Sequence, residues 1–284
     1  MAAADLEVLP DLPPMAAAFA RALVPAPRRP AAVAGHAVLV PGHVQDPARL
    51  ARYARVCGFT LRDTVPPTWL HVLAFPLHLH LLTDPATTLR LPGLVHASNR
   101  MRQLRPVAVG ERLDLQVGIG NLRPHRRGAL VDLTAGASVA DEPVWEGVST
   151  YLAAGAELAG TAEGLPREEF TAVTPTALWR LPAGLGRQYR EVSGDPNPIH
   201  TSRLAAKAFG FARPIVHGMW THARALAALE NRLPASYGVA AEFTRPILLP
   251  GTVGFSAVAT PGGWRAAVTS RDGSRPHLLI TAEA

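Results

Sequence analysis

The sequence runs through the same order of elements twice, and this duplication limits the folds open to it. In each half an apolar helical stretch leads to an Arg-Pro dipeptide and then to short strand-like stretches separated by polar turns. The helical stretches are residues 69–82 and 219–233, the dipeptides are Arg105-Pro106 and Arg245-Pro246, and the strand-like stretches are residues 113–117, 130–139 and 144–152, then 253–259, 264–269 and 277–282. A helix followed by an antiparallel sheet, twice over, predicts an α+β protein with two equivalent halves.

The second helical stretch indicates how each sheet folds. Apolar side chains cover too much of residues 219–233 for a helix that lies half in water. Turn signals at 260–263 and 271–274 favour an antiparallel meander of strands. We therefore expect each sheet to wrap around one buried helix.

The stretch between the halves differs in composition from both of them. It consists of small and acidic residues and lacks strand periodicity. It predicts a division into an N-terminal half (residues 1–155), a linker (156–175) and a C-terminal half (176–284).

Composition excludes several classes of protein. The single cysteine, Cys57, rules out a disulfide scaffold. Asp5, Glu7 and Asp11 lie near the N-terminus, where an export signal would have basic residues. Both observations favour a cytoplasmic location. The most apolar stretch, residues 70–82, is shorter than the ~20 residues of a membrane span. The net charge of +6 comes from 27 arginines and one lysine spread along the chain without interleaved aromatic residues, so we expect no nucleic-acid partner.

Residues 189–200 concentrate polar side chains in what the sequence predicts to be a rigid, non-helical loop. Pro196 and Pro198 push the residues before them towards extended conformations. Asp195, Asn197 and His200 together offer a carboxylate, an amide and an imidazole, which suits the binding of a water molecule. The alternative is an ordinary capped turn, in which Asp195 bonds its own backbone and a helix over 202–209 begins after His200.

A second signal lies at the mouth of the buried helix, in residues 210–220. Backbone N–H groups at a helix N-terminus lack partners and carry partial positive charge. The N–H of Gly218 can therefore stabilise a developing oxyanion, and the missing side chain lets a substrate carbonyl approach closely. The alternative is that Gly218 only permits a tight turn into the helix.

At these residues the chain resembles a known family. Residues 189–219 are similar to the hydratase 2 signature of MaoC-like (R)-specific enoyl-CoA hydratases and (3R)-hydroxyacyl-ACP dehydratases, S-G-D-x-N-P-x-H followed by A-x-x-x-G-F-x-x-P-I-x-H-G. The resemblance implies a double hotdog fold with a degenerate first half. It also implies a catalytic dyad of Asp195 and His200, an orienting role for Asn197 and an oxyanion-hole amide from Gly218.

Two departures from the family pattern accompany the resemblance. Ser202-Arg203 stands where relatives often have Asp-Pro, and it still supplies a helix cap. The first half lacks D-x-N-P-x-H, so we expect one active site per chain.

The implied reaction is the reversible hydration of trans-2-enoyl thioesters, carried by CoA or acyl carrier protein, to (3R)-3-hydroxyacyl thioesters. A base deprotonates water as it attacks C3, an acid protonates C2, and a donor stabilises the enolate oxygen. His200 is the better base near neutral pH, while Asp195 positions the water and passes the proton if its pKa is raised; the division between the two stays open. We expect neither metal nor cofactor, because the thioester already acidifies C2.

Alternative functions on the same fold are an acyl thioesterase and a non-catalytic acyl-thioester-binding subunit. A thioesterase places its nucleophile or base on the central helix or the opposite protomer, and a binding subunit dispenses with Asp195 or His200. A homodimer of double-hotdog protomers is a further expectation from the family.

Four remaining features have structural or open interpretations. His96 and His217 either line a substrate channel or are packed or solvent-bonded histidines. His78-x-His80 is a weak metal motif, because Pro76 interrupts the helix and alternate helical positions diverge. Cys57 is interpreted as a buried thiol. Pro76 either opens space for an acyl tunnel, or only bends the helix. The residues expected to line that tunnel are Val72, Phe75, Leu77 and Leu79.

Overall fold

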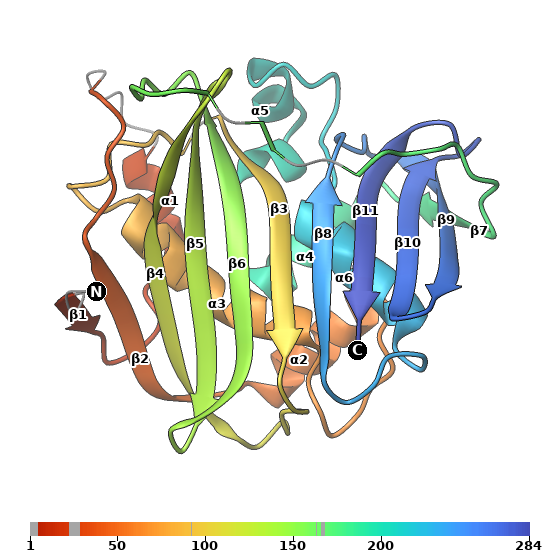
Figure 1. Ribbon diagram of the computed structural model, residues 1–284, viewed down its shortest axis with the longest axis horizontal. Coiled ribbons are helices and arrows are strands. Elements are labelled where there is room, and N and C mark those ends of the chain that lie inside the picture. Colours follow the sequence, from red (N-terminus) through yellow and green to blue (C-terminus); the bar gives the residue numbers. More distant parts are fainter. Residues whose placement is uncertain (1–4, 23–28, 92, 163, 166–167) are drawn as a thin grey trace.

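A computed structural model describes residues 5–22, 29–91, 93–162, 164–165 and 168–284. Within these residues no helix is both long and apolar enough to cross a membrane. One continuous sheet runs the full width of the molecule, and the helices pack against one of its faces (Figure 1).

The sheet of the described residues contains eleven strands in the order β1-β2-β4-β5-β6-β3-β8-β11-β10-β9-β7. The strands are β1 (Asp5–Val8), β2 (His36–Val44), β3 (Leu94–Gln103), β4 (Arg112–His125), β5 (Gly128–Val139), β6 (Glu142–Ala154), β7 (Ala177–Leu181), β8 (Tyr237–Phe243), β9 (Gly251–Thr260), β10 (Gly263–Ser270) and β11 (Pro276–Glu283). The two halves meet at the antiparallel pair β3–β8, whose register runs from Ser98 opposite Glu242 to Gln103 opposite Tyr237.

The helices include one long central helix in each half. The α-helices are α1 (Met15–Ala22), α2 (Pro47–Cys57), α3 (Pro67–Leu82), α4 (Leu185–Ser193), α5 (Arg203–Ala208) and α6 (Gly218–Leu229), and a single 3₁₀ turn, η1, covers Pro198–His200. The central helices α3 and α6 lie across the same face of the sheet (Figure 1). Nearly every residue of α3 is buried, as expected for a helix that is apolar all round.

Pro76 does not break the helix, contrary to the interpretation that it interrupts residues 69–82. Helix α3 continues through Pro76 to Leu82. A proline inside a helix removes one backbone hydrogen bond. Burial of most other α3 side chains, Ala74 and Leu77 among them, supplies the packing free energy that offsets this loss.

The structure also shows that the duplication extends into the helices. Trp69 and His71 occupy the third and fifth positions of α3, and Trp220 and His222 occupy the same positions of α6. Both indole N–H groups are satisfied internally. Trp69 Nε1 donates to the Gln45 side chain at 3.1 Å, and Trp220 Nε1 donates to the Val56 carbonyl at 2.9 Å.

Every predicted strand lies within an observed one, but five strands of the described residues were not predicted. The strands β2, β3, β7 and β8 were missed, as was the short edge strand β1, and α6 ends at Leu229 rather than at residue 233. Strand β3 is hard to recognise because two of its buried positions, Asn99 and Gln103, are polar, so the sequence does not show an apolar alternation. Its pairing on both edges, with β6 and β8, decides its conformation.

Candidate active site

The candidate site begins where α4 ends. Gly194 closes α4 in the left-handed conformation (φ 78°), and its N–H donates to the Arg190 carbonyl. The expectation of a non-helical stretch over 189–200 was therefore wrong at both ends, because 189–193 are helical and Pro198–His200 form η1. Pro198 is compatible with η1 because it stands at the start of the turn, where its missing N–H has no partner to lose.

Asn197 organises the turn that carries His200. Its side-chain oxygen accepts a hydrogen bond from the Ile199 N–H (3.3 Å) and so caps η1. Its own backbone N–H donates to Asp195 Oδ1 at 3.0 Å. Asn197 thus fixes Asp195 and His200 relative to each other, and the capped-turn geometry and the polar site occur together.

Asp195 is held in a largely buried position at the edge of a cavity. Burial raises the pKa of its carboxyl, and the nearby His200 partly offsets this increase. A carboxyl with a raised pKa retains its proton to higher pH, so Asp195 is suited to donate a proton as well as to orient water.

His200 has its tautomer fixed by the backbone. Nδ1 lies 2.8 Å from the Ile215 carbonyl oxygen, which only accepts hydrogen bonds, so Nδ1 carries the proton. The lone pair of the neutral ring is then on Nε2. Burial lowers the pKa of His200, and Asp195 partly offsets this decrease. The lowered pKa keeps the imidazole neutral and available as a base.

Helix α4 approaches His200 closely at Gly186. A Cβ added at Gly186 would lie 1.9 Å from the His200 carbonyl oxygen. Only glycine permits this contact, which holds η1 against α4.

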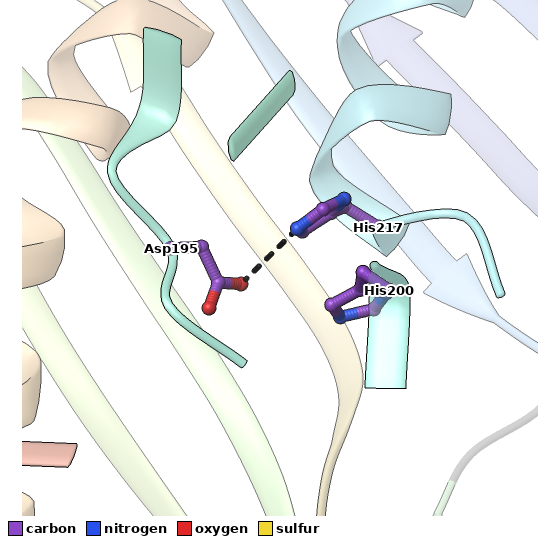
Figure 2. A group of neighbouring side chains, drawn as sticks. All are labelled: Asp195, His200 and His217. Atoms are coloured by element: carbon purple, nitrogen blue, oxygen red, sulfur yellow. Dashed lines mark ion pairs between the residues drawn. The ribbon is translucent and has the colours of Figure 1, made fainter. Parts of the chain in front are cut away.

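His217 is the site residue that sequence reasoning left undecided between lining a channel and packing. It is the N-cap of α6, and its ring stacks on His200 with 3.7 Å between ring centroids and 23° between planes. Nε2 of His217 lies 3.8 Å from Asp195 Oδ2 (Figure 2). Burial lowers the pKa of His217 well below its usual value, and His200 lowers it further. The sequence feature that could have identified His217 as a site residue is its position directly before Gly218.

Asp195, His200 and His217 also form the metal-capable group of the described residues. One donor atom from each lies within 4.8 Å of the others. Nδ1 of His200 is already hydrogen-bonded to the Ile215 carbonyl, so Nε2 is the atom that His200 offers to a proton or to a metal ion.

Gly218 is the first residue of α6, and its N–H lies at the positive end of a twelve-residue helix. The His217 side chain does not cap this terminus. A Cβ at Gly218 would lie 3.0 Å from the Phe243 ring, so the absence of a side chain also lets β8 pack against the helix start. Gly218 and Met219 both line the cavity.

One cavity of about 580 Å³ joins residues of both halves. The C-terminal half contributes Asp195, His200, His217 and Gly218 to its wall. The N-terminal half contributes one face of α3 and part of β3. The α3 residues on this wall are His71, Val72, Phe75, Leu79 and Leu82.

Leu77 was wrongly expected in this wall. It is fully buried in the core and does not line the cavity. The reason is helical periodicity, because Leu77 lies two positions from both Phe75 and Leu79 and so points away from their face.

The other features singled out from the sequence are structural. His78 is buried, whereas His80 Nε2 contacts Glu7 at 2.9 Å, so the two rings diverge. Cys57 is fully buried, and burial raises the pKa of its thiol.

Comparisons with known proteins agree with this geometry. Residues 180–268 match the MaoC like domain family. The chain is 38% identical over 237 residues, 83% of its length, to 3-hydroxyacyl-thioester dehydratase X of Mycobacterium tuberculosis (strain ATCC 25618 / H37Rv), of which it covers 85%.

Solved structures show the same architecture. The crystal structure of HtdX of Mycobacterium tuberculosis superposes with a TM-score of 0.78 at 36% identity, covering 87% of this chain and 99% of that one. A second Mycobacterium tuberculosis protein, described as having a double hotdog fold, superposes with a TM-score of 0.56 at 17% identity, covering 86% and 93% of the two chains. At that identity the second likeness concerns the fold alone.

Proposed function

Because the chain belongs to the MaoC-like dehydratase family and folds as a double hotdog, we propose that it interconverts trans-2-enoyl and (3R)-3-hydroxyacyl thioesters. The substrate is an acyl thioester, and the reaction is that of a hydro-lyase. One observation supports the proposal most directly. Asp195, His200 and the α6 terminus at Gly218 border the same cavity.

His200 acts as the base in the hydration direction. Its Nε2 takes a proton from water while the water oxygen forms a bond to C3. The electron pair of the C2–C3 double bond moves towards the thioester carbonyl, giving an enolate. The Nδ1–H bond to the Ile215 carbonyl holds the ring in position and stabilises the imidazolium that forms.

Gly218 stabilises the enolate, and Asp195 completes the reaction. The N–H of Gly218 donates to the enolate oxygen, with the dipole of α6 adding to the effect. Protonated Asp195 transfers its proton to C2, and the proton on His200 returns to Asp195. The raised pKa of Asp195 and the lowered pKa of His200 favour this return. Because the two groups are coupled, they titrate as a unit.

We assign different roles to the two halves of the chain. We assign catalysis to residues 176–284, the acyl tunnel to residues 1–155, and a connecting role to 156–175. The supporting observation is that the N-terminal half contributes apolar side chains, Phe75 and Leu79 among them, to the cavity that Asp195 borders.

The carrier group is expected at the edge of the cavity that Arg127 and Arg245 line. Both are exposed arginines, which suit the phosphates of CoA or of a phosphopantetheine-bearing carrier protein. A homodimer and a cytoplasmic location are further proposals, the second supported by the single cysteine, Cys57.

The test is hydration of crotonyl-CoA and longer trans-2-enoyl-CoAs by the purified protein, followed by the loss of enoyl absorbance and by product chirality. Asp195→Asn or His200→Ala should lower kcat by ~10²- to 10⁴-fold with an unchanged circular dichroism spectrum. His36→Ala on β2, outside the cavity, is the matched control and should keep full activity. Normal turnover by either active-site variant would contradict the assigned roles.

A further inference from the structure

Four histidines lie together where the central helices meet the sheet, and the hydration reaction uses none of them. His71 and His78 come from α3, His96 from β3 and His222 from α6. The centroid of the His71 ring lies 5.4 Å from that of His78 and 5.9 Å from that of His96. His222 is close enough to His71 that a positive charge on His71 would lower the pKa of His222. Among the described residues, none of the four forms an ion pair with an acidic side chain.

Two of these rings, His71 and His96, line the cavity, whereas His78 and His222 do not. The planes of His71 and His96 are stacked at 18°, and His96 also stacks on Tyr151 at 4.5 Å. Burial is the main cause that raises the pKa of Tyr151, and the nearby Asp195 carboxylate raises it further. The ring of Tyr151 therefore contacts His96 and lies near Asp195, which places the histidine pair next to the candidate catalytic carboxyl.

Among the described residues neither ring has a side-chain hydrogen-bond partner, and the His96 ring is hydrogen-bonded to the Ser98 backbone. Burial lowers the pKa of His71 to about 4 and that of His96 well below its usual value. Nε2 of His96 is buried and has no hydrogen-bond partner in the described part of the chain. A plain hydrocarbon chain passing these rings would leave Nε2 of His96 and the His71 ring without a hydrogen bond, which is unfavourable in an apolar site.

We propose that His71 and His96 form a polar subsite that binds an oxygen function, a hydroxyl or a keto group, on the acyl chain beyond the reacting double bond. The inference rests on the proposed hydratase function and names its substrate class. An imidazole with one N–H and one lone pair complements either group. A site built for such a hydrogen bond discriminates against the analogue that lacks it.

The helical geometry of α3 sets the order of the contacts. His71, Phe75 and Leu79 stand four residues apart on one face, which extends about 12 Å at about 1.5 Å per residue. The histidine pair is thus followed by an apolar stretch. The matching substrate carries its oxygen on the carbons soon after the double bond and a hydrocarbon end beyond them.

The experiment compares kcat/KM for pairs of trans-2-enoyl-CoAs of equal length, with and without an oxygen function. One arm moves a hydroxyl stepwise from C5 to C8, and a second arm does the same with a keto group. We expect one position to be preferred over the plain chain by about 5- to 100-fold, the value of one satisfied buried hydrogen bond. The arm that shows the preference identifies the group.

The variants test whether the pair causes that preference. His96→Leu or His71→Leu should reduce the ratio of oxygenated to plain substrate to about one, whereas His96→Gln, which keeps hydrogen-bonding atoms, should retain most of it. His78→Leu removes a buried histidine outside the cavity and should leave the ratio unchanged.

Each outcome has a defined meaning. A ratio near one at every position, with the plain chain turned over, would overturn the subsite and leave the proposed function standing. A preference that persists in both leucine variants would also overturn it. No turnover of any enoyl thioester would overturn the proposed function and the subsite with it.

Discussion

Acidification between pH 6 and 5 should destabilise this protein through its buried histidines. Burial lowers the pKa of His71 to about 4 and that of His222 to about 3, from an ordinary value of 6.5 in the unfolded chain. Well above pH 6.5 His71 and His222 are neutral in the folded and in the unfolded protein, so their titration does not change the free energy of unfolding. As the pH falls below 6.5, only the unfolded state takes up protons, and stability is lost.

The size of the effect follows from these values. Between pH 6 and 5 each of the two histidines lowers the free energy of unfolding by about 1.2 kcal/mol, which is about 2.4 kcal/mol for the pair. The pKa values of His78, His96 and His217 are lowered by burial as well and act in the same direction. The raised pKa of Asp195 acts in the opposite direction.

Urea unfolding at pH 7, 6, 5.5 and 5 measures this loss. His222→Gln removes one titrating group from the core and should reduce the loss between pH 6 and 5 by about 1.2 kcal/mol. Thr68→Val, a buried change on α3 that does not titrate, should shift stability equally at every pH. A wild-type free energy of unfolding that stays flat over this range, or a His222→Gln slope equal to that of the wild type, would refute the reasoning.

Three further predictions concern the cavity and the core. If Phe75 and Leu79 line an acyl tunnel, kcat/KM should rise by up to about 4-fold per added CH₂ between four- and eight-carbon enoyl-CoAs. Phe75→Trp or Leu79→Trp should abolish this rise while leaving the turnover of crotonyl-CoA unchanged. A preference of the wild-type protein for short chains would contradict the tunnel. Gly218→Ala should lower kcat by ~10²-fold, because its Cβ would lie 3.0 Å from the Phe243 ring and displace the N–H donor; full activity in the same assay would exclude the oxyanion role. Cys57, buried and with a raised pKa, should react with a thiol reagent only at the rate of unfolding, and fast labelling of the native protein would contradict its burial.

The sequence alone was sufficient where structure depends on neighbouring residues. Asp195, Asn197 and His200 lie within six positions, so the hydrogen bonds of their turn follow from local side-chain chemistry. The repeated order of helix and strands is also readable, because apolar periodicity reports which faces are buried. These signals gave the two-half α+β fold and the residues of the candidate site.

Tertiary structure decided what depends on contacts between distant segments. Strands β3 and β8 pair with each other across the two halves, and this long-range pairing joins the halves. His217 stacks on His200 only because α6 and η1 meet, and His71 lies beside His96 only because α3 packs on β3. Helical periodicity separates Leu77 from Phe75 and Leu79, and the packing of α3 against the sheet decides which of the two faces meets the cavity. Such contacts depend on the summed burial of many side chains, and a single sequence does not encode that sum in any one segment.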